Sequence, residues 1–506
     1  MGLRTPEQFL ESIRDDRVVY YEGKRVKDVT THPILRIGAE LCAMDYVVAM
    51  DPRFHDLYVT KVNGEEVPFI FAPVTSTEDL LRRRQITMAV SRTCFGMPGG
   101  ANFTGSDILN ALTVVSRRTD KRMGTHYTDR VEAYRKLLMH DDLAVCACMT
   151  DVKGDRSLHP GQQKQHKDFY VHIVDEQKDG IVVRGGKYHI SLSPTVNEIF
   201  VCPCRNMTEE DKDYAVAFSI PVNTPGLTLI VAPHEAFEVD NYDEFPLSAA
   251  HFTSEPLAVF DDVFVPMERV FLKGEWQFAA QAAYMFGNFH RLFADAYKYC
   301  ELEILVGSAL LMAEYNGLDK VEHVKDKLSW LLLYAESVDG LGLAACHYPV
   351  IEPDTGLAYP NPVFSNASKF YFANNWHQAM QYLQDITGGI IGDAPSFKDF
   401  YNPKLRPLME KYLAGKDGIP TEHRLRAIKV AKDIISQWQC AATIHGEGSL
   451  AAQKMSVFAT ADRERFKTAA RRAAGISDGS EHPVFRPLPD FPLGKKLRPK
   501  LKGIKT

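Results

Sequence analysis

Residues 151–160 read DVKGDRSLHP and residues 179–189 read DGIVVRGGKYH, and these two stretches decide the fold. The second opens with an Asp-Gly turn signal and continues as an apolar run, the pattern of a β-strand entered through a tight turn. Other short runs of strand character lie around it, at residues 169–174, 198–204, 214–220, 228–232 and 257–264. Six or more short strands at this spacing predict a compact β-barrel or sandwich from residue 144 to residue 272.

Helical patterns lie on both sides of the β segment. Before it, Thr5-Pro6-Glu7-Gln8 opens a helix with a capping residue and a proline in its first turn. Further helical runs cover residues 79–90, 107–115 with Ser106 as N-cap, and 128–139. After Phe271 the helical runs are long, at residues 276–312, 321–346, 367–386 and 421–440. Four long helices joined by short loops predict a four-helix bundle.

We therefore expect an α+β protein of three domains. An N-terminal, mainly α domain covers residues 1–143, a β middle domain covers 144–272, and a C-terminal four-helix bundle with an extended tail covers 273–506. This order is that of the acyl-CoA dehydrogenases, which is an analogy of fold and carries no function by itself. The tail is rich in proline and lysine from residue 487 to residue 505, which is typical of a solvated segment or one packed on a neighbouring subunit.

Composition excludes several classes of protein. The chain has 506 residues, of which 45% are hydrophobic and 25% charged, as in ordinary globular proteins. Its net charge of −6 argues against a general nucleic-acid binder. It contains no apolar run of about 18 residues, so we expect no membrane span. The N-terminus is charged and lacks the apolar centre of a signal peptide, and nine cysteines do not form a disulfide framework. We expect a cytoplasmic protein.

Several further stretches carry a resemblance to a known family. They are EEDKDYAVAF (209–218), VFDDVFVP (259–266), HVKDKL (323–328), DITGGI (385–390) and IHGEGS (444–449). In this order and spacing, together with the two stretches quoted above, the chain resembles the 4-hydroxyphenylacetate 3-hydroxylase / 4-hydroxybutyryl-CoA dehydratase superfamily over nearly its whole length. Several stretches, notably DVKGDRS and EEDKDYAV, are nearer the dehydratase branch.

The resemblance implies an FAD held between the β middle domain and the bundle. A turn that exposes backbone N–H groups can meet flavin carbonyls, and an arginine can support an anionic flavin or a phosphate. By position, the residues along the flavin are Met149, Lys153, Gly154, Asp155 and Arg156, with Ser191 near the ring. Gly388 and Gly389 can face the cofactor of a neighbouring subunit or form a helix C-cap, and Gly448 and Ser449 match another cofactor-facing position. The alternative for Asp155 and Arg156 is a surface ion pair.

Metal binding is where the chain departs from the dehydratases, which carry an iron–sulfur cluster on three cysteines and a histidine. Those positions fall on Cys94, Pro98, His290 and Tyr297 here. Proline cannot ligate a metal, and a cluster needs about four soft ligands, usually thiolates. A shifted site made of Cys94, His290 and Cys300 stays open but would need a new geometry. We expect no metal.

Three residues are candidates for catalysis. Glu255 matches an active-site glutamate of the dehydratases, and Lys298 matches a lysine of the same family. His290 can serve as a base without a metal, because an unperturbed imidazole titrates near neutral pH. The alternatives are a strand-edge charge for Glu255, a core histidine with its bonds satisfied for His290, and a surface helix residue for Lys298.

Other polar groups of both branches are missing. A tyrosine and a glutamate of the dehydratases fall on Ala294 and Ala442, and Glu447, a possible replacement carboxylate, is expected at the surface. The loop FGMPGGANFT has the length found in the hydroxylases. Their substrate-binding arginine, tyrosine and histidine, however, fall on Gly100, Thr104 and Ala147.

These observations favour a cluster-free, FAD-dependent oxidoreductase. The first hypothesis is a reduced-flavin-dependent, two-component monooxygenase of a small substrate, with phenols among the candidates. The alternative is a cluster-free CoA-thioester enzyme (a double-bond isomerase, a dehydratase-like enzyme or an acyl-CoA dehydrogenase) that uses His290 or Glu255 as base. A catalytically silent flavin-binding paralogue is the third reading. The chain has no G-x-G-x-x-G fingerprint after a strand, so a separate flavin reductase is the expected partner. The resemblance implies a homotetramer.

Overall fold

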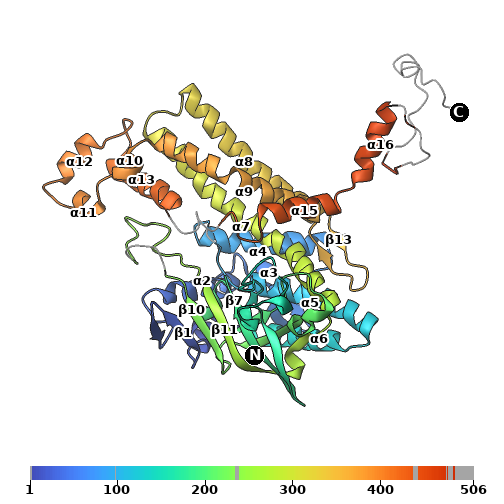
Figure 1. The fold of residues 1–506 in the computed structure, drawn as a ribbon. Helices are drawn as coiled ribbons and strands as arrows, with labels where there is room; N and C mark the ends of the chain where they lie inside the picture. Colours follow the sequence, from blue (N-terminus) through green and yellow to red (C-terminus); the bar gives the residue numbers. More distant parts are fainter. Residues whose placement is uncertain are drawn as a thin grey trace.

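The computed structural model describes residues 3–96, 98–233, 239–436, 443–474, 476 and 482–484. The proline- and lysine-rich tail, Ala442 and the end of the helix predicted over 421–440 lie outside the described residues. Figure 1 shows two parts of the molecule. The long helices α7, α8 and α9 lie in one part, and the β layer lies with the N-terminal helices in the other. The predicted α+β class, with a helical N-terminal part, a β middle and a helical C-terminal part, is confirmed.

The N-terminal part is mainly helical, as predicted. Thr5 caps the first helix, with its side chain accepting from the Gln8 N–H and Gln8 reaching back to the Thr5 N–H. The prediction that Ser106 is an N-cap is wrong, because that helix begins four residues earlier and the Ser106 hydroxyl bonds to the Phe103 carbonyl inside it. The helices are α1 (Pro6–Ser12), α2 (Leu35–Met50), α3 (His55–Tyr58), α4 (Thr77–Thr93), α5 (Asn102–Met123) and α6 (Tyr127–Asp141).

The β segment forms two sheets packed face to face, so a sandwich and not a closed barrel is present. One sheet has the strand order β2-β1-β10-β11-β7-β6 and the other β12-β9-β8-β5. Their inner faces share one apolar core, in which Ile181 and Val183 of β7 lie with Ile199 and Val201 of β8. The strands are β1 (Val18–Tyr21), β2 (Lys24–Val26), β5 (Val145–Cys148), β6 (His172–Glu176), β7 (Gly180–Lys187), β8 (Glu198–Val201), β9 (Val216–Pro221), β10 (Leu227–Val231), β11 (Pro256–Pro266) and β12 (Val270–Lys273). The first two come from the N-terminal segment, and β1 runs parallel to β10. A small hairpin, β3 (Val59–Val62) with β4 (Glu65–Pro68), lies apart.

The two stretches that decide the fold lie side by side. Asp151 and Lys187 form a β-bridge, and the Tyr188 N–H donates to the Thr150 carbonyl at 2.8 Å. The Lys187 ammonium is buried and pairs with the Asp151 carboxylate at 2.6 Å. The turn that follows Asp151 is therefore fixed beside the end of β7.

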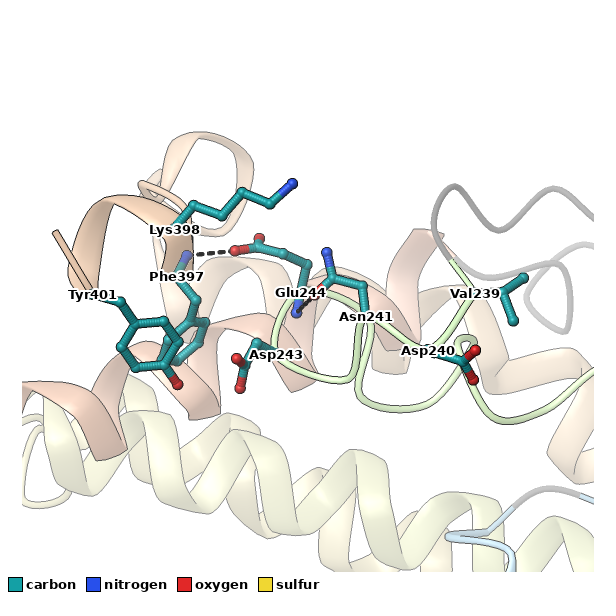
Figure 2. A pocket seen from close by; sticks show the side chains of 8 residues that line it. All are labelled: Val239, Asp240, Asn241, Asp243, Glu244, Phe397, Lys398 and Tyr401. Atoms are coloured by element: carbon teal, nitrogen blue, oxygen red, sulfur yellow. Dashed lines mark hydrogen bonds between the residues drawn. The ribbon is translucent and has the colours of Figure 1, made fainter.

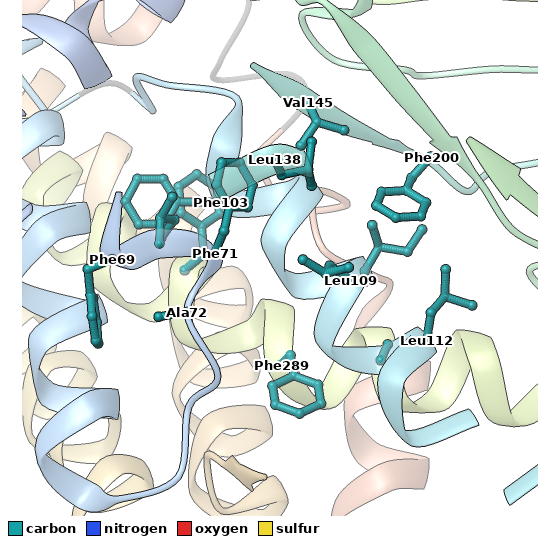
Figure 3. Packing of buried hydrophobic residues seen from close by; sticks show 14 of the residues in the cluster. Phe69, Phe71, Ala72, Phe103, Leu109, Leu112, Leu138, Val145, Phe200 and Phe289 are labelled. Carbon is teal, nitrogen blue, oxygen red and sulfur yellow. The ribbon is translucent and has the colours of Figure 1, made fainter. Parts of the chain in front are cut away.

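The C-terminal part is built on α7 (Ala279–Tyr315), a helix of 37 residues. Its first half packs on the N-terminal helices, where the rings of Phe293 and Phe103 stack with centroids 5.2 Å apart. Figure 3 shows this core, with Phe289 of α7 below Leu109 and Leu112 of α5. The second half joins α8 (Glu322–His347), α9 (Pro362–Thr387) and α13 (Thr421–Ser436) in the predicted bundle.

Shorter elements complete the C-terminal part. They are β13 (Val350–Ile351), β14 (Ala358–Tyr359), α10 (Ile390–Asp393), α11 (Phe397–Phe400), α12 (Arg406–Tyr412), α15 (Leu450–Thr460) and α16 (Arg463–Ala474). Residues 443–449, which precede α15, contact α7 and α9, because Thr443 accepts from Lys298 and Lys369 and Glu447 pairs with Lys298. In Figure 1, α16 points away from the body of the protein.

Candidate active site

His290 is held on the first half of α7 by a carboxylate and two aromatic rings. Its Nδ1 lies 3.0 Å from Asp107 Oδ2, and Asp107 forms a second ion pair with Arg83 at 2.6 Å. The imidazole ring stacks between Phe286 and Phe293. Because Nδ1 bonds to the carboxylate, Nε2 is left to accept a proton when the ring is neutral. The ring is thus oriented for proton transfer, and sequence patterns gave no sign of Asp107 or Arg83 in this role.

Glu255 and Ser191 touch each other. The Ser191 hydroxyl donates to Glu255 Oε1 at 2.6 Å. Burial raises the pKa of Glu255 to about 7, while the Ser191 hydrogen bond lowers it and the charge of Glu447 raises it further. A carboxyl group with a pKa near the working pH suits general acid–base catalysis. The residue expected near the flavin ring and a predicted catalytic residue thus form one unit.

Lys298 is fully buried, so a surface helix position is ruled out for it. Its ammonium donates to the Tyr297 hydroxyl at 2.7 Å and to Thr443 Oγ1 at 3.0 Å. The Tyr297 hydroxyl in turn donates to Glu447 Oε1 at 2.7 Å, and Glu447 Oε2 lies 3.4 Å from the Lys298 ammonium. A buried charge is tolerated when it is paired and hydrogen-bonded in this way.

The expectation that Glu447 lies at the surface is wrong. Its side chain is only 10% exposed, because residues 443–449 fold back onto α7. The backbone of Glu447 has φ +57° and that of Gly448 has φ +104°, both left-handed. This conformation is uncommon for a residue with a side chain, and it points the carboxylate into the protein.

The three predicted catalytic residues meet electrostatically at Glu447. Burial opposes ionisation of this carboxyl, but Lys298, Lys369 and His290 hold its pKa below the ordinary value. Burial and the neighbouring Lys298 lower the pKa of Lys369 to about 7. The structure therefore brings together groups that lie between 78 (Lys369) and 192 (Glu255) positions from Glu447 in the sequence.

The turn expected along the flavin is exposed, and its Lys153 acts electrostatically on His189, two residues before Ser191. Lys153 and Gly154 have left-handed backbones, with φ +75° and +50°, and Arg156 is exposed. The Asp155 carboxylate accepts from the backbone and hydroxyl of Ser157, so it does not close the turn through the surface ion pair considered above. Met149 lies at the edge of the helical core, and its carbonyl accepts from the Lys187 ammonium at 2.9 Å.

The surface around this turn suits an aromatic group that carries phosphates. Tyr188 and Val152 are 41% and 38% exposed although they are hydrophobic, and the ring of Tyr188 lies tilted against that of His189 with centroids 4.2 Å apart. Lys153 and Arg156 supply positive charge within the same segment. Exposed rings next to cations can hold a flavin and its pyrophosphate, so the residues present fit FAD.

The other glycine positions divide into two cases. Gly388 ends α9 with φ +78°, and Gly388 and Gly389 have open space where side chains would be, so Gly388 is a C-cap in this chain. A contact of Gly388 or Gly389 with a neighbouring subunit's cofactor stays a prediction. Gly448 and Ser449 lie next to Glu447, and Ser449 caps α15 by accepting from the Ala452 N–H.

Cysteine chemistry does not assemble a cluster site from the described residues. Cys94 packs in the core between the N-terminal helices and α7, whereas Cys300 belongs to a separate small cluster with Met88. The Tyr297 hydroxyl is engaged by Glu447 and Lys298. Within the described ranges, no three histidine, cysteine or acidic side chains gather as metal ligands. The donors present do not fit an iron–sulfur cluster, and we derive no step through one.

A shallow pocket of about 310 Å³ lies elsewhere, between the loop at Val239–Glu244 and α11 (Figure 2). Its lining carries three carboxylates, but each already has a cationic partner: Asp240 pairs with Arg36, Asp243 with Arg426 and Glu244 with Lys429. The carboxylates are thus neutralised, and none of the predicted site residues lines this pocket, so the candidate active site lies elsewhere.

A cluster of buried acids and bases, together with an exposed turn that carries cations, is the combination expected of a cofactor-dependent enzyme. Comparison with known proteins gives the family. The chain matches the 4-hydroxyphenylacetate 3-hydroxylase N-terminal model over residues 5–272 and the C-terminal model over residues 279–475. It belongs to the 4-hydroxyphenylacetate 3-hydroxylase family.

Individual relatives come from both branches of the superfamily. The chain is 30% identical to 4-hydroxybutyryl-CoA dehydratase/vinylacetyl-CoA-Δ-isomerase of Clostridium aminobutyricum, over 94% of this chain and 100% of that protein. It is 28% identical to the 4-hydroxyphenylacetate 3-monooxygenase oxygenase component of Thermus thermophilus, over 85% and 88%. The structure is similar to an oxygen-tolerant archaeal 4-hydroxybutyryl-CoA dehydratase from N. maritimus (TM-score 0.87, 28% identity, 99% and 100% covered). It is also similar to the oxygenase component of 4-hydroxyphenylacetate 3-monooxygenase complexed with FAD (TM-score 0.84, 25% identity, 93% and 98% covered).

The membrane prediction can be compared with the helices directly. Among the described residues, none of the helices combines the length and the apolar character that a membrane crossing requires.

Proposed function

We propose that this protein is the FAD-dependent oxygenase component of a two-component monooxygenase that acts on a small phenolic substrate. The observation that carries the proposal is the hydrogen bond between Ser191 and Glu255, which joins the segment expected at the flavin ring to the buried acid–base cluster. Relatives named as oxygenase components support it, including those for 4-hydroxyphenylacetate and 4-nitrophenol. A separate flavin reductase and a homotetramer are parts of the same proposal.

Reduced FAD, when bound, would supply the electrons that activate oxygen. The residues of the chain have the task of preparing the substrate. A phenol reacts as an electron donor once its hydroxyl proton is removed, and Glu255 and His290 are buried groups that can exchange protons in this site. Asp107 keeps the imidazole oriented, and Lys298 offers positive charge to an anionic substrate. Lys153, Arg156 and the exposed Tyr188 would hold the cofactor.

A second candidate is favoured by a specific observation. The 30%-identical dehydratase is matched over its full length, and Glu255, His290 and Lys298 stand at positions that it shares with this chain in the resemblance described above. A CoA-thioester enzyme would use the same cluster to remove a proton next to the thioester carbonyl. Because the cluster ligands are not all present, this candidate is a cluster-free isomerase or dehydrogenase.

One set of assays separates the candidates. The protein loaded with chemically reduced FAD is mixed with oxygen and either 4-hydroxyphenylacetate or 4-nitrophenol, and the products are weighed by mass spectrometry. Gain of one oxygen atom by the phenol supports the monooxygenase. Bleaching of oxidised FAD by butyryl-CoA under argon supports the CoA-thioester enzyme instead, and bound FAD with neither reaction supports a catalytically silent paralogue.

Variants connect the outcome to the site. Glu255→Gln and His290→Ala are each expected to lower turnover by about 10²- to 10⁴-fold while FAD binding is retained. The matched control is Glu303→Gln, which changes a carboxylate of the same helix α7 that pairs with Arg92 at the surface. Equal loss of activity in the control and the site variants would contradict the assignment.

A further inference from the structure

Glu447 has a geometry that the proposed function does not use. The carboxylate is brought to the cluster by two consecutive left-handed residues and is fixed by the Tyr297 hydroxyl at 2.7 Å. Left-handed backbone at a glutamate is uncommon, and its strain is usually accepted where a side chain must be held in one direction. The strain therefore indicates that the direction of this side chain matters.

The two oxygens of Glu447 differ. Oε1 accepts from Tyr297, whereas Oε2 is buried and accepts no hydrogen bond from the described residues, although the Lys298 ammonium lies 3.4 Å away. A buried carboxylate oxygen without a hydrogen-bond donor is rare in a folded protein, and it is the atom at which a ligand's acidic hydrogen can be received. Burial raises the pKa of Tyr297 well above its ordinary value, so its hydroxyl stays a donor.

We propose that Glu447 is the carboxylate base of this site, that Tyr297 and Lys298 are its positioning residues, and that Glu255 is the paired acid. The step is one proton transfer. The bond between the substrate and its acidic hydrogen breaks, the electron pair stays on the substrate, and the proton moves to Glu447 Oε2. No oxidant or reductant takes part. The inference rests on the proposed function only in placing the substrate beside the cluster, and it applies to a phenol O–H and to an acidic C–H alike.

The electrostatic surroundings support opposite roles for the two carboxyl groups. From α7, Lys298, His290 and Tyr297 act on Glu447, as does Lys369 from α9, and together they outweigh burial so that it stays ionised. Glu301, also on α7, is a nearby carboxyl whose pKa burial raises to about 7. Among the described residues, only the Ser191 hydroxyl offsets the effect of burial on the pKa of Glu255. Two titratable groups whose surroundings push their pKa values apart are the usual form of an acid–base pair.

Infrared difference spectra between pH 5 and pH 8 test the assignment without any ligand. The wild-type protein is expected to lose a buried carboxylic-acid band of Glu255 on the way to pH 8. The Glu255 component of this band is absent in Glu255→Gln, whereas the component of Glu301, whose pKa is also about 7, remains. In Glu447→Gln the midpoint of the Glu255 component falls, because an ionised neighbour no longer opposes its ionisation. An unchanged midpoint in Glu447→Gln, or a titrating band that disappears with Glu447 and persists without Glu255, would overturn the proposal.

A probe of proton removal tests the role of Glu447 as base. The FAD-loaded protein receives 4-nitrophenol, whose colour reports its ionised form, or butyryl-CoA in heavy water, whose hydrogen exchange is followed by mass spectrometry. Glu447→Gln is expected to reduce ionisation or exchange at least tenfold, and Glu303→Gln to leave it unchanged. If Glu447→Gln keeps the ionisation or the hydrogen exchange within twofold of the wild type, Glu447 is not the base.

Tyr297→Phe distinguishes positioning from simple structural support. Loss of the hydroxyl donor is expected to raise the pKa of Glu447, so the acid limb of the pH profile moves to higher pH without loss of FAD. A wild-type protein that binds FAD but acts on neither probe would contradict the proposed function. The infrared titration needs no ligand, so it would still test separately whether Glu447 is ionised next to a protonated Glu255.

Discussion

Replacing Lys298 by methionine tests the buried cluster most severely, because this ammonium is its central cation. Lys298 is fully buried and contacts Tyr297, Thr443 and Glu447 at 2.7 to 3.4 Å. Removing one partner of a buried ion pair leaves the other charge uncompensated, which costs about 3–5 kcal/mol. We therefore expect Lys298→Met to lower the free energy of unfolding of the bundle by that amount.

The measurement is urea unfolding followed by tryptophan fluorescence, since Trp376 is buried in the bundle core. A loss of this size corresponds to a fall of the midpoint by about 1 M or more at unchanged slope. The control Lys325→Met breaks a pair with Glu322 that is 51% and 89% exposed, and it should change stability by about 0.5 kcal/mol or less. The double variant Lys298→Met/Glu447→Gln should regain part of the loss, because the charge left alone is gone.

The pH dependence gives a second check on the same variant. The pKa of Glu447 is lowered in the folded state, so its stabilising contribution is present above the unfolded value of 4.5 and is lost as pH falls through the folded value. The difference between the wild type and Lys298→Met should thus be largest at neutral pH and shrink below about pH 4. A loss of less than about 1 kcal/mol at neutral pH, or strictly additive effects in the double variant, would refute the buried ionic cluster.

Two further predictions concern the cofactor side of the site. Ser191→Ala removes the hydrogen bond that lowers the pKa of Glu255, so this pKa should rise further above its ordinary value. The rise would be measured as a higher midpoint in the infrared titration or in the pH profile of the rate. An unshifted midpoint would show that Ser191 does not act on Glu255. Gly154→Ala places a Cβ 2.2 Å from the Phe169 ring at φ +50°, so FAD affinity should fall at least tenfold in a fluorescence titration. Gly124→Ala, at φ +74° with open space, should lower stability by only about 1 kcal/mol and leave FAD binding intact.

Elements with a strong local pattern were predictable from sequence. The long helix expected at 276–312 is found at Ala279–Tyr315, and the strand expected to start at Gly180 starts there. The start of α5 is not predictable in the same way, because a serine at the N-cap and a serine whose hydroxyl bonds within its helix, as Ser106 does, are the same residue type in the sequence. Local sequence patterns therefore predict whether a segment is a helix or a strand better than they predict where it begins and ends.

The candidate site was predictable only in part. The resemblance points to His290, Glu255 and Lys298. In the structure, His290 and Lys298 act on the Glu447 carboxylate, and the charge of Glu447 acts on Glu255. Glu447 was expected at the surface because nothing in its own segment shows that the chain folds back onto α7. The adjacent glycine at 448 is the one local sign of the unusual backbone that turns this glutamate inward. Contacts between residues some 150 positions apart depend on packing, which a single sequence does not state.

We expect the flavin ring to lie against Ser191 and Glu255 at the edge of the buried cluster. The most direct measurement is an experimental structure of the protein with FAD. We predict that the ring system contacts Ser191 and stands next to Glu255, with Lys153 and Arg156 along the rest of the cofactor. An FAD bound elsewhere, with the Ser191–Glu255 pair out of reach of the ring, would contradict the account.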